Sequence, residues 1–196
     1  HLRISKIGSV KIKLHRPIDG RTKTLTIKRE AGKWFAIFSV EVESTPLPAS
    51  AEAIGIDVGL THFATLSDGT QIANPRHARR AEAKVRRAQR RVSRRKRGSA
   101  GRREAVRLLQ TVYARVRRQR ADAHHKLSRQ LVNRYGLIAV EDLNVKGLAR
   151  GMLAKSVHDA GWSSFIAQLA YKAESAGRLL VKVDPRGTSQ TCPCGA

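Results

Sequence analysis

Two acidic residues stand in matching positions, each at the end of a short apolar run. Asp57 follows Ile54-Gly55-Ile56, and Glu141 follows Leu137-Ile138-Ala139-Val140. This pattern is expected where two buried strands deliver carboxylates to one edge of a sheet. Mg2+ prefers oxygen ligands and is usually held by one or two protein carboxylates together with substrate phosphates. The pair therefore predicts a divalent-metal site that acts on phosphodiesters.

The charge of the chain favours a polyanionic partner. The 196 residues carry 39 Lys and Arg against 15 Asp and Glu, which gives a net charge of +24. Such a chain repels itself unless a polyanion is bound. Its 41% hydrophobic residues are enough for a packed core. Its apolar runs are far shorter than the roughly 18 residues that cross a bilayer, so no membrane segment is predicted.

The two cysteines and the chain ends indicate a compartment and a longer reading frame. Cys192 and Cys194 lie within five residues of the end, and no signal peptide precedes His1. These features favour a reducing, cytoplasmic location. The chain lacks an initiator Met and stops just after Gly195. We therefore expect that it is a piece of a longer protein.

Residues 1–45 alternate between apolar and polar side chains, as in residues 10–14. With Asp19-Gly20 and Ala31-Gly32 as turns, the pattern predicts antiparallel strands of the kind that build a barrel. Their outward lysines face either solvent or nucleic acid. Residues 46–52 are predicted to be a linker, because they hold two prolines and small polar residues.

Residues 53–190 are predicted to form a second, α/β domain. Strands are expected at residues 53–57, 62–67, 70–73, 137–140 and 179–183. Asn74-Pro75 predicts the start of a helix and Gly98 its end, and a second helix is expected over residues 102–134. A third helix is expected to begin at a capping box that starts at Ser156 and to end at Gly177.

The two predicted helices form a strongly basic insertion over residues 75–135. Ala81, Val85, Ala88 and Val92 make a narrow apolar seam, which predicts an antiparallel hairpin. The segment from 76 to 135 holds 22 basic and 3 acidic residues. A solvated helix pair would interleave both signs, so phosphate binding is favoured. The candidate nucleic-acid-binding residues are Arg86, Arg87, Arg90, Arg91, Arg94, Arg95, Lys96 and Arg97.

The order of three strands, helical hairpin, strand, helix and strand fits an RNase H-like domain. The chain also resembles the TnpB, or OrfB, family of transposon-encoded RNA-guided nucleases, which are related to type V CRISPR effectors. The resemblance covers residues 54–195 in the family's order. It is carried by Gly55-Ile56-Asp57-Val58-Gly59-Leu60, Leu66-Ser67-Asp68-Gly69, Val140-Glu141-Asp142-Leu143-Asn144-Val145-Lys146-Gly147, Tyr171-Lys172-Ala173 and Thr188-Ser189-Gln190-Thr191-Cys192.

This resemblance implies a RuvC-type DNA endonuclease of a mobile element. Asp57 and Glu141 would be the first two of three carboxylates that bind two Mg2+ ions. Residues 1–45 would end a wedge-like barrel that grips guide RNA and target DNA. Residues 191–196 would begin a zinc ribbon, with Cys192 and Cys194 as half of its ligands, although their spacing is Cys-x-Cys. The third carboxylate would lie beyond that ribbon, so the 196-residue chain by itself is expected to be inactive.

Other titratable residues near the pair are assigned structural roles. Asp142 is interpreted as a capping or supporting group. Asp68 is placed on a turn, Asp159 at a helix start and Asp184 at a strand end before proline. The histidines His124, His125 and His158 are expected to be solvated or capping residues.

Two other functions remain as alternatives. The run from Gly55 to Thr61 also resembles the first phosphate loop of actin-like and sugar-kinase ATPases, but no second glycine-rich loop follows. A nucleic-acid-binding fragment or decayed paralogue without catalysis would explain the arginines and the missing third acid, and leave the paired acids unexplained. The sequence does not set the oligomeric state.

Overall fold

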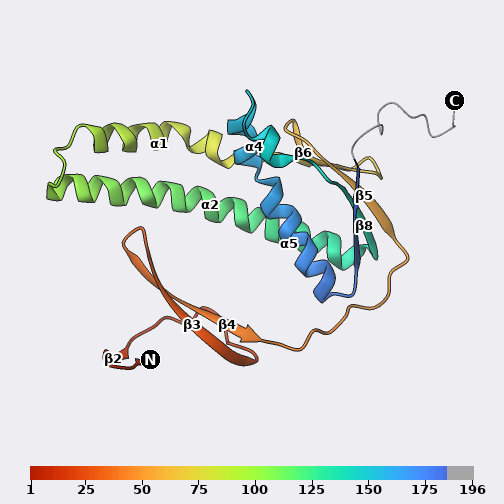
Figure 1. Ribbon diagram of the computed structural model, residues 1–196, viewed down its shortest axis with the longest axis horizontal. Coiled ribbons are helices and arrows are strands. Elements are labelled where there is room, and N and C mark those ends of the chain that lie inside the picture. Colours follow the sequence, from red (N-terminus) through yellow and green to blue (C-terminus); the bar gives the residue numbers. More distant parts are fainter. Residues whose placement is uncertain (185–196) are drawn as a thin grey trace. The chain divides into compact units, whose positions relative to one another are not determined.

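The computed structural model describes residues 1–184 and divides into two compact units at Ser44 (Figure 1). In the first unit, β1 (Leu2–Ile4) pairs with β2 (Gly8–Val10), and β3 (Arg21–Glu30) pairs with β4 (Lys33–Glu41), both antiparallel. Ala31 and Gly32 have φ values of 49° and 79° and form the predicted hairpin turn. The chain is in a strand only up to Val10 and not over residues 10–14 as expected, because β2 pairs with only three residues of β1.

The second unit contains a five-stranded mixed sheet in the order β7-β6-β5-β8-β9. Its strands are β5 (Ala53–Val58), β6 (His62–Leu66), β7 (Gln71–Ala73), β8 (Leu137–Glu141) and β9 (Leu179–Val183). The first three pair antiparallel, whereas β5, β8 and β9 run parallel. All five strands lie where their apolar runs predict them. The mixed α/β class is confirmed, and the parallel centre of the sheet requires long connections between its strands.

The first long connection is a helical hairpin made of α1 (His77–Ser93) and α2 (Ala100–Arg134), which lie side by side and antiparallel (Figure 1). The seam residues of α1 are half-buried, as predicted. The ends of α1 differ from the prediction. The helix begins after Arg76, because Asn74 instead accepts a hydrogen bond from the Arg76 amide in a turn. It ends at Ser93, five residues before Gly98.

The second connection contains α3 (Val145–Leu148), α4 (Ala154–Ala160) and α5 (Trp162–Ser175). The single helix expected from Ser156 is therefore two helices. Gly161 interrupts it with a left-handed φ of 68°, and the side chain of Ser156 lies within α4 rather than at a cap. None of the helices in residues 1–184 is both long enough and apolar enough to cross a membrane.

The core lies where α2 and α5 pack on one face of the sheet. The fully buried side chains include Phe165 and Leu169 of α5, Val132 of α2 and Ile138 of β8. Lys172 of α5 is also buried, and its ammonium group donates to the carbonyl oxygen of His125 and to the Ser128 hydroxyl, both at 2.7 Å. These bonds satisfy the buried charge and join α5 to α2.

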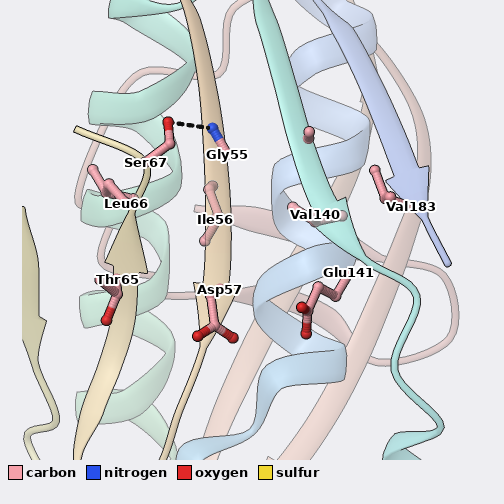
Figure 2. Close-up of a pocket in the computed structure, with 10 residues that line it drawn as sticks. Gly55, Ile56, Asp57, Thr65, Leu66, Ser67, Val140, Glu141 and Val183 are labelled. Carbon is pink, nitrogen blue, oxygen red and sulfur yellow. Dashed lines mark hydrogen bonds between the residues drawn. The ribbon is translucent and has the colours of Figure 1, made fainter. Parts of the chain in front are cut away.

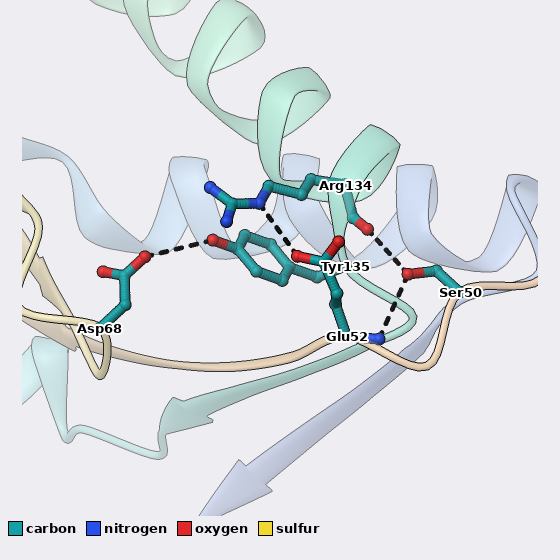
Figure 3. A network of polar contacts seen from close by, with 5 residues as sticks. All are labelled: Ser50, Glu52, Asp68, Arg134 and Tyr135. Atoms are coloured by element: carbon teal, nitrogen blue, oxygen red, sulfur yellow. Dashed lines mark hydrogen bonds and ion pairs between the residues drawn. The ribbon is translucent and has the colours of Figure 1, made fainter.

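A polar network joins the residues predicted to form the linker to the end of α2 (Figure 3). The Arg134 guanidinium donates to the Glu52 carboxylate at 3.0 Å, and the Ser50 hydroxyl donates to the Arg134 carbonyl at 2.9 Å. The phenol of the neighbouring Tyr135 donates to Asp68 at 3.4 Å. These bonds hold the residues just before β5 beside the residues just before β8. The two strands are therefore kept together at this end.

His124 is a core residue, which contradicts the prediction that it is solvated or capping. It is 4% exposed and packs between the rings of Phe63 and Phe165, with centroid distances of 5.2 and 5.8 Å. Its Nε2 donates to the Ala160 carbonyl oxygen at 3.0 Å. Burial lowers the pKa of His124 to about 4. The imidazole is therefore neutral in the folded protein at neutral pH.

Because the pKa of His124 is lowered in the folded state, we expect the protein to lose stability in acid. The unfolded chain takes up a proton at the ordinary histidine pKa of 6.5, whereas the folded protein resists it down to about 4. The contribution of His124 to the free energy of unfolding should therefore be constant above pH 6.5. It should fall by up to about 3 kcal/mol as the pH drops to 4, at about 1.36 kcal/mol per pKa unit. Urea unfolding at a series of pH values measures this loss.

Two comparisons isolate the contribution of His124. His124→Leu should flatten the pH dependence, whereas His158→Asn, at an exposed position, should leave it unchanged. A titration of the imidazole signals by NMR gives a second measurement that needs no variant. A His124 pKa near the ordinary histidine value of 6.5 would contradict the prediction.

Candidate active site

The two predicted carboxylates lie next to each other on neighbouring parallel strands. Ile56 of β5 is paired with Val140 of β8, so Asp57 and Glu141 are the next residues along the two strands. Ile56 and Val140 are buried against the helices, and because side chains alternate along a strand, both acids project to the opposite face. Figure 2 shows their carboxylates side by side at the carboxyl end of the two strands.

The electrostatics of Glu141 reflect this proximity. Burial raises its pKa above the ordinary value, and the negative charge of Asp57 raises it further. Like charges that face each other disfavour ionisation, and a cation between them would remove that cost. The arrangement is therefore suited to bind a positively charged group.

An open pocket of about 290 Å³ surrounds the pair. It is lined by Gly55, Ile56, Asp57, Thr65, Leu66, Ser67, Ala139, Val140, Glu141 and Val183. Gly55 and Ala139, the residues two positions before each acid, are small and lie on the same face. They leave the space beside the carboxylates free for a ligand.

Two hydroxyl residues of the pocket were missed by sequence reasoning. Thr65 of β6 is paired directly with Asp57, and Figure 2 shows its side chain next to that carboxylate. The Ser67 hydroxyl accepts a hydrogen bond from the Gly55 amide at 3.0 Å, and the Ser67 amide donates to the Gly55 carbonyl at 2.9 Å. Thr65 can be identified only once the antiparallel register of β5 and β6 is known, because that register places it opposite Asp57.

Three other acidic residues, Asp142, Asp68 and Asp159, interact with groups other than the Asp57 and Glu141 carboxylates. Asp142 accepts from Lys182 at 3.0 Å, and Asp68 holds the β6–β7 turn through the Thr70 amide at 2.9 Å. Asp159 lies in the last turn of α4 rather than at a helix start, and it binds the first amides of α1. Within residues 1–184, no group of three or more His, Cys, Asp or Glu side chains could hold a metal. In this part of the chain, the site consists of one pair.

The eight predicted nucleic-acid-binding residues are all exposed. Those from Arg86 to Arg91 lie on α1, but the run from Arg94 to Arg97 lies in the loop between α1 and α2 rather than on a helix that continues to Gly98. The loop is held from α2, because the Arg102 guanidinium donates to the carbonyl oxygens of Val92 and Arg95 at 2.9 and 3.1 Å. The loop therefore presents four consecutive positive charges at the outer end of the hairpin. The cysteines at 192 and 194 lie outside the described residues.

The chain matches two protein families and several curated relatives. Residues 37–152 match the OrfB_IS605 family, described as "Probable transposase", and residues 162–196 match the "Cas12f1-like, TNB domain" family. The chain is 42% identical over 170 residues to a "Putative RNA-guided DNA endonuclease" of Streptomyces pristinaespiralis, covering 86% of this chain and 42% of that protein. It is 30% identical over 210 residues to the "Putative RNA-guided DNA endonuclease InsQ" of Escherichia coli (strain K12), covering 98% and 52%.

The chain thus spans about half the length of the curated relatives it matches. A chain in the solved structure titled "Cryo-EM structure of the Cas12f1-sgRNA-target DNA complex" aligns with a TM-score of 0.49 and 16% identity, over 88% of this chain and 45% of that one. The OrfB_IS605 match, by contrast, covers more than half of this chain and includes both carboxylates and the basic hairpin. The ATPase alternative is therefore set aside, and the protein is a member of the TnpB/OrfB family of transposases.

Proposed function

We propose that the intact protein is a Mg2+-dependent DNA endonuclease with an RNase H-like, RuvC-type catalytic domain, and that Asp57 and Glu141 bind the metal. The observation that carries the proposal is the pair itself: two carboxylates on adjacent positions of parallel strands, in an open pocket. The mixed sheet supports the RNase H-like class, because its two parallel pairs and its antiparallel meander follow the strand order expected for that fold.

The residues of the pair fit Mg2+. Both ligands are carboxylate oxygens, which hard divalent cations prefer. Burial and the charge of Asp57 raise the pKa of Glu141, and a bound cation would offset both effects. When bound, two such ions would activate water and stabilise the leaving oxygen of a phosphodiester. Asp57 and Glu141 would hold the ions, and the adjacent hydroxyl of Thr65 would orient the Asp57 carboxylate.

The basic hairpin would bind the substrate backbone. Guanidinium groups bind phosphate in a bidentate manner and remain charged at neutral pH. The relatives are named as RNA-guided DNA endonucleases, which supports target DNA and a guide RNA as the partners of the intact protein. We place the reaction in the cytoplasm, at the nucleoid. In the intact protein, Cys192 and Cys194 would form half of a zinc site, completed by a second pair of ligands.

The metal requirement tests this function directly. The intact protein with its guide RNA should cut a matched DNA duplex in Mg2+. EDTA should reduce the cleavage to background and added Mg2+ should restore it, because the carboxylates alone do not activate water. Cleavage that persists in EDTA would contradict the proposal. Binding without cleavage in Mg2+ would favour the alternative of a nucleic-acid-binding protein without catalysis.

A further inference from the structure

The N-terminus of α1 is capped by a residue more than 80 positions away in the sequence. Arg76 precedes the helix in a left-handed conformation, with φ of 47°, and its side chain makes no capping bond. The amides of Ala78 and Arg79 instead donate to the two carboxylate oxygens of Asp159, at 2.8 and 3.1 Å. The first amides of a helix lack intrahelical partners and attract negative charge. Asp159 supplies both the acceptors and the charge.

Two more contacts join α4 to the hairpin. Lys155 of α4 donates to Glu82 of α1 at 2.7 Å. From α2, the Arg120 guanidinium donates to the carbonyl oxygens of His158 and Asp159. The short helix α4 therefore binds α1 and α2 at the same place. Its own position is fixed, because Val157 and Ala160 are buried in the core.

The position of α1 depends on these contacts more than that of α2. Of its 17 residues none is fully buried, whereas α2 contributes seven buried residues. A helix in a protein takes most of its stability from the packing of its apolar face. The seam that α1 packs against α2 is made of alanines and valines.

We infer that Asp159 is a positioning residue for the nucleic-acid-binding hairpin. By capping α1 from α4, it fixes the direction of the arginines on α1 relative to the Asp57 and Glu141 carboxylates. Substrate held by those arginines is thereby held in place at the catalytic pair. This inference rests on the proposed function, because it concerns where bound DNA lies relative to the Asp57 and Glu141 carboxylates and not whether the DNA binds.

The test compares Asp159→Ala and Asp159→Asn with a matched control in the intact protein and its guide RNA. Asp122→Ala is the control, because it removes one exposed acid from the same hairpin and disturbs only an ion pair with Lys126 at 2.8 Å. The single-turnover cleavage rate at saturating protein and the Kd for target DNA are measured for each. Asp159→Asn keeps one acceptor oxygen, so it serves as the conservative variant.

We expect Asp159→Ala to lower the cleavage rate about tenfold to hundredfold, since a misplacement of about 1 Å costs on the order of 100-fold. Its Kd should change by less than about threefold, because the arginines remain. Asp159→Asn should fall between this variant and the wild type, and Asp122→Ala should match the wild type. An unchanged rate in Asp159→Ala, or a rate that falls only in proportion to affinity, overturns the inference.

Hydrogen exchange separates failure of this inference from failure of the proposed function. In the 196-residue chain, the amides of Ala78 and Arg79 should lose protection in Asp159→Ala and keep it in Asp122→Ala. If the wild-type protein binds DNA without cutting it, the proposed function fails, and the exchange result still decides whether Asp159 holds α1. Unchanged protection in Asp159→Ala overturns the positioning role by itself.

Discussion

We expect Asp57→Ala to abolish the proposed DNA cleavage by the intact protein and to leave its affinity for target DNA within about twofold. Within residues 1–184, Asp57 and Glu141 form the proposed metal-binding pair, and Asp57→Ala would remove one of its two carboxylates. A bound metal supplies several kcal/mol of transition-state stabilisation. At 1.36 kcal/mol per tenfold change, the cleavage rate should fall by about 10³-fold or more. Single-turnover cleavage and a filter-binding assay measure the two quantities.

Asp142→Ala is the matched control for this prediction. Asp142 directly follows Glu141, but it is exposed and pairs with Lys182, so its loss should leave the rate within about twofold. Asp57→Asn should be nearly as inactive as Asp57→Ala, because an amide keeps the shape and loses the charge. Cleavage by Asp57→Ala at the wild-type rate would remove the pair from the mechanism.

We expect that replacing Arg94, Arg95, Lys96 and Arg97 together with Gln weakens binding to nucleic acid and reduces its dependence on salt. The four residues are consecutive and exposed in the loop at the outer end of the hairpin. Each phosphate neutralised on duplex DNA contributes about −0.9 to the slope of log K against log salt. If all four bind phosphate, the slope should become shallower by about 3.6. Fluorescence anisotropy between 50 and 200 mM salt measures the change.

The control for this variant removes the same charge from the first unit. Lys6, Lys11, Lys13 and Lys33 are exposed, and replacing them with Gln lowers the net charge equally. Because these lysines are spread along the chain, we expect a smaller change in the slope for duplex DNA. Equal changes in both variants would show that the affinity depends on net charge alone and not on the hairpin loop.

The strands of the five-stranded sheet could be predicted because each is a short apolar run that ends at a turn residue or a charge. The positions of Asp57 and Glu141 near the ends of two strands could be predicted for the same reason, because each carboxylate directly follows such a run. Thr65 was missed because its relation to Asp57 depends on the register of β5 and β6. A single strand does not encode its register, which is set by the turn and by the burial of one face.

The helix ends were harder to predict because tertiary contacts set them. Gly98 was expected to end α1, yet the helix ends at Ser93, where the Arg102 guanidinium donates to the carbonyl oxygens of Val92 and Arg95. His124 lies in a strongly basic stretch, which favoured an exposed position. It is buried because α2 turns that residue towards Phe63 and Phe165. Neither contact is visible in the local sequence.

The long insertion between the two acids also affects how the site assembles. The pairing of β5 with β8 joins residues separated by more than 80 positions, and non-local parallel pairing of this kind slows folding. The hairpin of α1 and α2 consists of local contacts, and it returns the chain to the sheet after crossing to the outer loop. Once the hairpin has formed, β5 and β8 are no longer joined by a long flexible loop. Less conformational entropy is then lost when the two strands pair. If the hairpin that carries most of the positive charge forms before the strands pair, it also shortens the chain closure that brings Asp57 and Glu141 together.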